Sequence, residues 1–303
     1  MQTIETERLS PRYSGIDLWG STDVLDAMIE GQFAALAAVR AARPAIVAAA
    51  EAMESRLKTS GRLIYAGAGT SGRLAVQDGA ELMPTFSWPP ERLLLLIAGG
   101  QQALTQSVEG AEDESEHALE LVRRFAVNPA DVLIAVAASG TTPFTLACQR
   151  GAKRQGALTI GIANNEGTAL LAEADHPIFL DTGPEPIAGS TRMKAGTAQR
   201  TTLGLLSSLL MIRLGRVHDG MMIDVQATNK KLTQRSETML AHLTGRDPAD
   251  VQSALARADG NVKLAVLLLK GADLKGANPA LARSEGRLRE AIALIEQRPE
   301  SAA

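Results

Sequence analysis

Short runs of apolar residues alternate with helical stretches through the middle of the chain. The runs are apolar at every position, which is typical of strands buried on both faces of a sheet. They cover residues 63–66, 93–98, 132–137, 158–163 and 178–180. Strands that alternate with helices imply right-handed crossovers between parallel neighbours. The pattern therefore predicts an α/β fold with a doubly wound, five-stranded parallel sheet.

Helical patterns flank this region on both sides. Residues 1–20 carry little periodicity and predict an extended arm. Asp23 is a candidate N-cap, and Pro44 suits the first turn of a second helix. Asp247 and Pro248 form a similar start near the C-terminus, where Gly260 separates two helical pieces. The expected helices cover residues 23–39, 44–57, 192–214, a stretch that begins near 222, and 280–296.

These elements predict four parts of the chain. We expect an N-terminal arm and helices over 1–58, the α/β domain over 59–217, a connecting helix over 218–245 and a small helical domain over 246–303. The last part is short for an independent core, so we expect it to dock on the rest. Its helices resemble a ubiquitin-associated-like bundle, for which a packing or dimerisation role is preferred.

Composition narrows the class of protein. The net charge of −3 argues against a general polyanion binder, so no nucleic-acid partner is expected. Cys148 is the one cysteine, which excludes internal disulfides and a cysteine-based zinc cluster. The four histidines lack metal-ligand spacing, so neither a metal nor a cofactor is expected. Neither a signal sequence nor a membrane span is visible, which predicts a cytoplasmic protein.

Candidate chemistry begins with a glycine-rich loop directly after the first strand. Gly69, Thr70 and Ser71 open the following helix, whose free N–H groups suit a phosphate. The spacing also matches a dinucleotide fingerprint, which needs an acidic residue after the next strand. That strand ends in Ala98-Gly99-Gly100-Gln101, without an acid. A terminal phosphate is therefore favoured, with a glycine turn that binds nothing as the alternative.

A second hydroxyl-rich loop follows the third strand and contains Ser139, Gly140, Thr141 and Thr142. Alone, helix capping explains it better than ligand binding. Two such loops after strands of one sheet change the balance, because ligands bind beyond the carboxyl ends of the strands. We expect both loops to meet at one phosphate.

A third loop precedes the long helix predicted from residue 192. Ser190, Thr191 and Arg192 are candidate phosphate ligands, with Lys194 beside them. The alternative is a helix cap with a solvated basic pair. Charge-assisted hydrogen bonds to phosphate contribute about 1.5–3 kcal/mol each. A few of them would hold a sugar phosphate without metal or nucleotide.

The glycine-rich loops resemble those of the sugar isomerase (SIS) phosphosugar-binding fold. The segment 183–199, which contains Gly-Ser-Thr-Arg-Met-Lys-Ala-Gly-Thr, closely resembles the signature of N-acetylmuramic acid 6-phosphate etherases. Further matching segments are 67–74, Asp78 with Glu81, 84–86, 97–100 and 109–113, within a resemblance from about Glu5 to Leu269. The chain departs from the family pattern at Gly79-Ala80, where Ala-Ser is common, at Leu82-Met83, where Cys-Pro is common, and at Gly204, where Asn is usual.

This resemblance implies a homodimeric enzyme of cell-wall recycling. It would convert N-acetylmuramic acid 6-phosphate to N-acetylglucosamine 6-phosphate and D-lactate. The family's two catalytic carboxylates match Glu81 and Glu112. In the ring-opened sugar, a base removes the C2 proton and an acid protonates the departing lactyl oxygen, after which water adds back. On the resemblance and this chemistry we assign Glu81 as the acid and Glu112 as the base.

Helical periodicity tests these two carboxylates less sharply. A helical wheel over residues 104–122 puts Glu112 and Glu114 beside the apolar stripe and Asp113 away from it, and does not choose between the two glutamates. Glu81 follows Ser71 by ten residues, or about 15 Å of ideal helix. Either the helix breaks near Gly79 or Glu81 serves a pocket completed by the other subunit, and we hypothesise the second.

Two other functions fit the same fold. One is an aldose–ketose phosphate isomerase, which would not need the 190–199 signature. The other is a sensor that binds a phosphosugar without turnover, as in the glucokinase regulatory protein, which resembles this family but carries two SIS domains. Groups for the lactyl carboxylate are not defined by pattern, although Arg73 and Arg192 are candidates.

Overall fold

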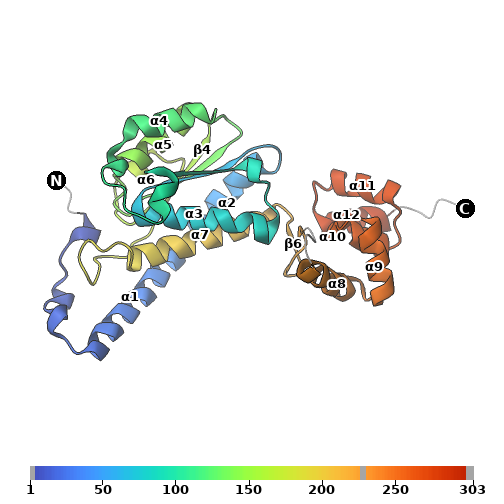
Figure 1. Cartoon of the computed structure of the whole chain (residues 1–303), viewed down its shortest axis with the longest axis horizontal. Coiled ribbons are helices and arrows are strands. Elements are labelled where there is room, and N and C mark those ends of the chain that lie inside the picture. Colours follow the sequence, from blue (N-terminus) through green and yellow to red (C-terminus); the bar gives the residue numbers. More distant parts are fainter. Residues whose placement is uncertain (1–3, 226–229, 298–303) are drawn as a thin grey trace, which may run out of the picture. The chain divides into compact units, whose positions relative to one another are not determined.

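The computed structural model describes residues 4–225 and 230–297 of the chain. The chain divides into two compact units (Figure 1). The first contains Met1–Ala80 and Pro90–Leu209, and the second contains Glu81–Pro89 and Leu210–Ala303. Helices α3 and α7 each run from one unit into the other. The domain boundaries expected after residues 58, 217 and 245 stay predictions.

The first unit is built on the predicted five-stranded parallel sheet. Its strands are β1 (Leu63–Gly67), β2 (Leu93–Ile97), β3 (Val132–Val136), β4 (Leu158–Ala163) and β5 (His176–Phe179), in the order β2-β1-β3-β4-β5. Every residue of β1 and β3 is buried. Burial on both faces explains why these runs are apolar throughout.

Helices cover both faces of this sheet, as a doubly wound fold requires. The helices in this part of the chain, among which α1 contacts α2, are α1 (Ser21–Ala41), α2 (Arg43–Leu57), α3 (Gly69–Phe86), α4 (Ser115–Arg124), α5 (Pro143–Arg154), α6 (Ala169–Glu173) and α7 (Lys194–Arg213). Helix α5 packs on β1, β3 and β4 with α4 against it, and α2 packs on β3, β4 and β5. Figure 1 shows α4 and α5 on one side of the sheet and α3 and α7 on the other.

The N-terminal segment differs from the expected extended arm. Its described part forms three 3₁₀ turns, η1 (Glu5–Glu7), η2 (Pro11–Tyr13) and η3 (Ile16–Leu18). The prediction of Asp23 as an N-cap is also wrong, because α1 begins at Ser21 and Gly20 holds the cap position. Asp23 lies in the first turn, where a carboxylate still favours the helix through the macrodipole.

The second unit is a helical bundle with a short hairpin. Its elements are β6 (Val217–His218), β7 (Met221–Met222), α8 (Lys230–Thr244), α9 (Pro248–Arg257), α10 (Val262–Leu269), α11 (Leu274–Arg283) and α12 (Leu288–Glu296). The predicted cap at Asp247 is confirmed, since its side chain accepts from the N–H groups of Ala249 and Asp250. Asn261 caps α10 in the same way.

Two helices of this unit were predicted with the wrong extent. The helix expected from about 222 begins at Lys230, since Met221 and Met222 pair with β6; residues 226–229 lie outside the described part. The helix expected over 280–296 is two helices. Glu285 and Gly286 have φ angles of 52° and 77°, so the chain leaves the helical conformation there.

Membrane-spanning potential is limited in the described ranges. No single helix there has the length and hydropathy to cross a membrane. Helices α1 and α2 meet those criteria only as a joined pair, which is bent by 54°.

Candidate functional site

The site lies at the point where the order of strand addition reverses within the sheet. From β1 the chain crosses to β2 on one side, while β3, β4 and β5 follow on the other. The carboxyl ends of β1 and β3 are therefore neighbours, with Gly67 in register with Val136. The loops after these strands lead into α3 and α5. This is the topological switch point where α/β sheets bind ligands.

A cavity of about 360 Å³ opens at this point, entirely within the first unit. It is lined by Thr6, Glu7, Ala68, Gly69, Thr70, Ser71, Glu112, Asp113, Ala137, Ala138, Ser139, Thr141, Thr142, Pro143 and Thr191. The first two loops therefore meet at one cavity, as predicted, and the phosphate expected between them stays a prediction. Hydroxyl groups and carboxylates share the wall, and none of the described residues that line it is a lysine or arginine.

The first loop brings the start of α3 very close to β1. Gly69, the first residue of α3, has a φ of 53°. A Cβ at Gly72 would lie 2.8 Å from the carbonyl carbon of Gly67, so only glycine fits there. This approach points the helix N-terminus at the cavity. The N–H groups of that first turn have no partner within the helix and are suited to an anion.

The second loop presents an N-terminus that its own side chains leave uncapped. Pro143 is the first residue of α5, and Thr142 holds the N-cap position without a side-chain cap bond. Instead the Thr142 hydroxyl lies 3.3 Å from that of Ser139, which also accepts from the Thr141 N–H. Gly140 shapes the turn with a φ of 67°. The Thr142 side chain therefore does not cap α5, contrary to the alternative explanation of this loop.

The third loop contributes Thr191 to the cavity, while its charged residues have other partners. Glu185 is buried and accepts from the N–H groups of Lys194 and Ala195. Its carboxylate therefore occupies the N-terminus of α7. Burial raises the pKa of Glu185, and burial lowers the pKa of Lys194. Lys194 is buried and donates to the Thr182 carbonyl, so the alternative of a solvated basic pair is wrong. Ser190 is half-buried and Arg192 is exposed.

The acidic wall of the cavity comes from a 3₁₀ turn, η6 (Ala111–Asp113). The helical wheel over 104–122 was therefore built on the wrong geometry, because Gly110 has a φ of 72° and α4 begins only at Ser115. In this turn Glu112 and Asp113 both line the cavity, so the inference that Asp113 points away is wrong. Glu114 is not among the described residues that line the cavity.

A third carboxylate, Glu7, lines the cavity and was not predicted. Thr6 is buried and fixes this segment, since Asn165 donates to its hydroxyl over 3.1 Å and accepts from its N–H over 3.4 Å. The Gly189 N–H donates to the Thr6 carbonyl. A Cβ at Gly189 would lie 2.7 Å from the Glu7 carboxylate, so this glycine makes room for it. The only sequence signal was that the family resemblance begins near Glu5.

Glu81 lies in the part of α3 that belongs to the second unit, and it is exposed. Helix α3 is continuous, so the alternative of a break near Gly79 is wrong. Gly79 fits tightly, since a Cβ there would lie 2.6 Å from the Leu95 side chain. One turn before Glu81, buried Asp78 accepts from Tyr65 at 2.7 Å and from Ser207 at 3.1 Å. Burial raises the pKa of Asp78.

Arg73, a candidate for the lactyl carboxylate, has backbone partners. Its guanidinium donates to the carbonyls of Ala103 and Gln106 at 2.8 and 3.1 Å. It therefore holds the loop that follows β2.

Within the described ranges, no group of three or more His, Cys, Asp and Glu side chains is arranged to bind a metal ion.

The sheet order and the hydroxyl-lined switch point together define a SIS domain. Two family models agree: that of the glucokinase regulatory protein N-terminal SIS domain matches residues 45–152, and that of the SIS domain matches residues 105–209. A phosphoheptose isomerase from Francisella tularensis shares the fold, with a TM-score of 0.50, 21% identity, and coverage of 63% of this chain and 98% of that chain.

Closer relatives are found among the etherases. The N-acetylmuramic acid 6-phosphate etherase of Deinococcus radiodurans is 51% identical over 265 residues, which cover 88% of this chain and 87% of the relative. That of Streptomyces coelicolor is 44% identical over 269 residues, which cover 89% and 86%. The chain belongs to the N-acetylmuramic acid 6-phosphate etherase family.

Proposed function

We propose that this protein cleaves the D-lactyl ether of N-acetylmuramic acid 6-phosphate, releasing D-lactate and N-acetylglucosamine 6-phosphate. The observation that carries the proposal is the 51% identity to an etherase over 88% of the chain. The cavity supports it, because it combines a phosphate-type cradle with carboxylates. The cytoplasmic localisation expected from the family resemblance is part of the same proposal.

The phosphate binds at the N-termini of α3 and α5. Gly69, Thr70 and Ser71 surround it from the first loop, and Ser139, Gly140, Thr141 and Thr142 from the second. Ser190, Thr191 and Arg192 complete the set from the third loop. Support comes from the lining of the cavity by seven of these ten residues and from the missing side-chain cap on α5. None of the described residues that line the cavity is a lysine or arginine, so backbone N–H groups and helix dipoles supply most of the positive potential, and Arg192 adds its charge from outside that lining.

Two carboxyl groups with opposite protonation carry out the reaction. Glu112, as carboxylate, removes the C2 proton of the ring-opened sugar. The C3–O bond then breaks, and protonated Glu81 donates its proton to the lactyl oxygen. Water adds to the resulting double bond, giving its hydroxyl to C3 and a proton to C2. Each proton transfer contributes about 10²–10⁴-fold to the rate. The lining of the cavity by Glu112 supports its part in this scheme.

Glu7 and Asp113 bind the sugar itself. A carboxylate near a phosphate is repulsive, so these two side chains face the uncharged part of the ligand. There they accept hydrogen bonds from sugar hydroxyls or from the acetamido N–H. Their lining of the same cavity as the phosphate cradle supports this assignment.

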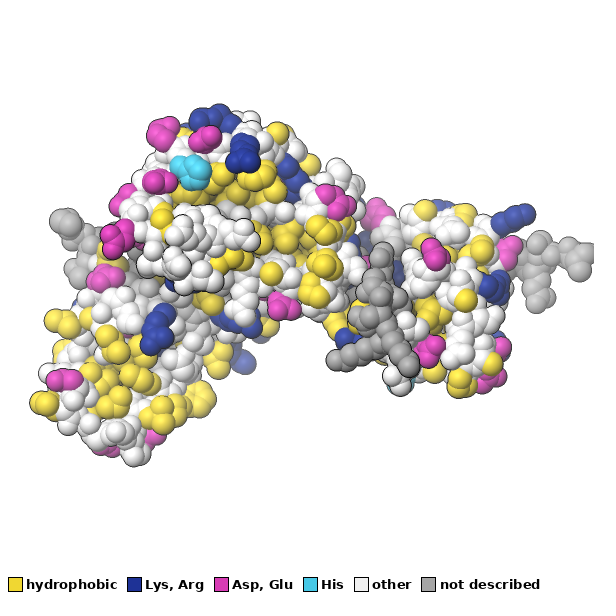
Figure 2. All heavy atoms as spheres, viewed as in Figure 1, with side chains coloured by type: hydrophobic (Ala, Val, Ile, Leu, Met, Phe, Trp, Pro, Cys, Tyr) yellow, Lys and Arg dark blue, Asp and Glu magenta, His cyan; other side chains and the backbone are white. Residues whose placement is uncertain are grey.

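The enzyme works as a homodimer whose active sites draw on both subunits. Support comes from helix α1, which exposes Leu25, Ile29, Phe33 and Leu36 at helical spacing along one stripe. Figure 2 shows hydrophobic side chains gathered over this helix. Phe33 is 67% exposed, and an apolar stripe of this kind marks an interaction surface. A second copy of the chain is the occupant that also explains how Glu81 reaches a sugar.

The test is D-lactate release from N-acetylmuramic acid 6-phosphate. We expect release by the wild-type protein and a loss of about 10²-fold or more in Glu112→Gln. Glu114→Gln, two residues away and outside the described lining, is the matched control and should keep activity. Binding of the substrate without turnover by the wild type would indicate a sensor. Conversion of an aldose phosphate to a ketose phosphate without lactate would indicate an isomerase.

A further inference from the structure

The C-terminal end of helix α3 requires polar partners. The last carbonyl oxygens of a helix receive no hydrogen bond from an N–H group of the same helix, and they lie at the negative end of its dipole. Here the chain leaves α3 through Ser87, which has a φ of 50° and donates its N–H to the Met83 carbonyl, an αL-type ending. Glu81 lies five residues before the last helical residue, Phe86.

Arg216 supplies those partners from beyond the end of α7. Its Nη1 donates to the carbonyl of Phe86 at 2.6 Å and to that of Ser87 at 3.1 Å. Its guanidinium carbon also lies 5.2 Å from the ring centroid of Trp88, which is 1% exposed. This is a cation–π arrangement with a buried indole. One side chain therefore fixes three consecutive residues at the end of the helix that carries Glu81.

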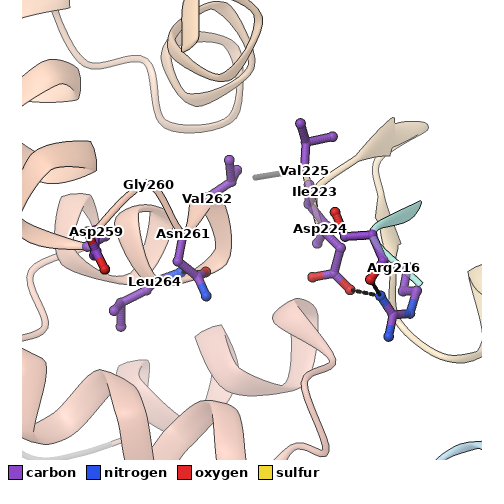
Figure 3. Close-up of a pocket in the computed structure, with 11 residues that line it drawn as sticks. Arg216, Ile223, Asp224, Val225, Asp259, Gly260, Asn261, Val262 and Leu264 are labelled. Carbon is purple, nitrogen blue, oxygen red and sulfur yellow. Dashed lines mark hydrogen bonds and ion pairs between the residues drawn. The ribbon is translucent and has the colours of Figure 1, made fainter. Parts of the chain in front are cut away.

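Arg216 is in turn fixed by the C-terminal helices. Asp224 lies 3.3 Å from the Arg216 Nη1 and 2.7 Å from the Nζ of Lys263, a buried residue of α10. Figure 3 shows the Arg216–Asp224 pair at one wall of a cavity of about 580 Å³, with the α9–α10 loop at the other. Burial lowers the pKa of Arg216 and of Lys263, and Asp224 opposes both shifts. Asp224 thus pairs with both the half-buried Arg216 and the buried Lys263.

We propose that Arg216 is a positioning residue for Glu81, and that Asp224 and Lys263 connect this clamp to the C-terminal helical bundle. The inference rests on the proposed function, in which Glu81 is the acid that protonates the lactyl oxygen. The bundle thereby takes part in catalysis. Lys263 of α10 pairs with Asp224, and Asp224 pairs with Arg216, which binds the end of α3. All of these residues belong to the second unit.

The kinetic consequence is specific. The phosphate cradle is made by residues of the first unit, so loss of the clamp leaves substrate binding in place. A displacement of about 1 Å at a reacting group costs about 10²-fold in rate. We expect Arg216→Met to lower kcat by about 10- to 100-fold with little change in KM. Arg216→Lys should recover part of the loss. An ammonium group can donate to one carbonyl, but it lacks the planar guanidinium that donates to both carbonyls and stacks on Trp88.

A double-mutant cycle separates positioning from general damage. If Arg216 acts through Glu81, Arg216→Met added to Glu81→Gln should cause little further loss of kcat. Equal losses in both backgrounds, or a rise in KM alone, would overturn the proposal. Arg257→Met, which changes an exposed arginine of the same unit, is the control and should behave as wild type.

Hydrogen exchange gives a readout that does not depend on turnover. Arg216→Met, and more weakly Lys263→Met, should speed amide exchange over residues 82–88 while α5 stays protected. Unchanged exchange there contradicts the clamp. If the wild-type protein releases no D-lactate, the proposed function fails by itself, and exchange still decides whether Arg216 holds the end of α3.

Discussion

At the residue scale, the cavity is notable for how it divides charge. Its wall carries seven hydroxyl side chains and three carboxylates. Lys194 is buried, and the exposed Arg192 is not among the described residues that line the cavity. In the proposed function, N–H dipoles and hydroxyls of the wall would hold a dianionic phosphate together with Arg192, and the carboxylates would face the rest of the ligand. This distribution of charge would give a sugar phosphate one preferred orientation.

Glu7 tests this orientation. Hydrogen bonds to charged groups contribute about 1.5–3 kcal/mol, so Glu7→Gln should raise KM by about 10-fold or more. Glu5→Gln is the matched control, because Glu5 lies in the same 3₁₀ turn and pairs with Arg8 at 2.9 Å. Steady-state D-lactate assays on both variants give the answer. An unchanged KM in Glu7→Gln would remove this residue from the site.

The surroundings of His218 predict that the stability of the second unit depends on pH. Burial lowers the pKa of its imidazole, while Asp219 raises it and Arg289 and Lys270 lower it. With a folded pKa below the unfolded value of 6.5, the unfolded chain binds more protons between the two values. The contribution of His218 to stability is therefore complete above pH 6.5 and declines as the pH falls towards the folded pKa.

Replacement of His218 isolates this effect. We expect the free energy of unfolding of the wild type to fall more than that of His218→Gln between about pH 7.5 and about pH 5.5. Urea unfolding at the two pH values, followed by a signal from the second unit, provides the measurement. Parallel changes in both proteins would show that His218 does not titrate as described.

At the element scale, the sheet was predictable because its strands are buried on both faces. Such strands are apolar at every position, and the parallel order follows from the crossovers. Helix boundaries were less predictable. The break at Glu285 and the end of the helical period at Gly110 depend on left-handed backbone conformations, which an apolar period does not reveal.

The site was predictable only where it follows strands. The loops after β1 and β3 meet because their strands are neighbours. Glu7 reaches the same cavity through Thr6 and Asn165, which are 159 residues apart in the chain. No local pattern encodes such a contact. Likewise, the choice of Glu112 and Asp113 over Glu114 is made by a 3₁₀ turn and not by a helical face.

The close packing of the first loop can be tested at Gly72, with a glycine outside that loop as the control. Gly72→Ala should lower the free energy of unfolding by about 1–3 kcal/mol, because a Cβ there meets the backbone of Gly67 at 2.8 Å. Gly204→Ala in α7 is the control, since its nearest neighbour would be the Asp78 carboxylate at 3.9 Å. That change should stabilise by up to about 1 kcal/mol through helix propensity. Denaturant unfolding of both variants measures the difference, and equal effects would contradict it.

At the scale of the whole molecule, two features need an explanation: the exposed apolar stripe on α1 and the place of Glu81 in the second unit. The stripe on α1 contains Leu25, Ile29, Phe33 and Leu36, with exposed fractions from 44% to 67%. Glu81 and the loops that line the cavity belong to different compact units of the chain. The proposed homodimer would account for both features, because it would cover the stripe and let one subunit complete the cavity of the other.

Mixed subunits decide whether the sites are shared. A heterodimer of Glu81→Gln and Glu112→Gln subunits, isolated with two different tags, retains one site with both carboxylates if each site draws on both chains. It should show about half of the wild-type D-lactate release, whereas each parent homodimer is nearly inactive. Phe33→Asp in both subunits should reduce recovery of the doubly tagged species and the restored activity together, since it places a charge on the α1 stripe. A purified heterodimer without activity would mean that Glu81 and Glu112 act within one chain or not as a pair.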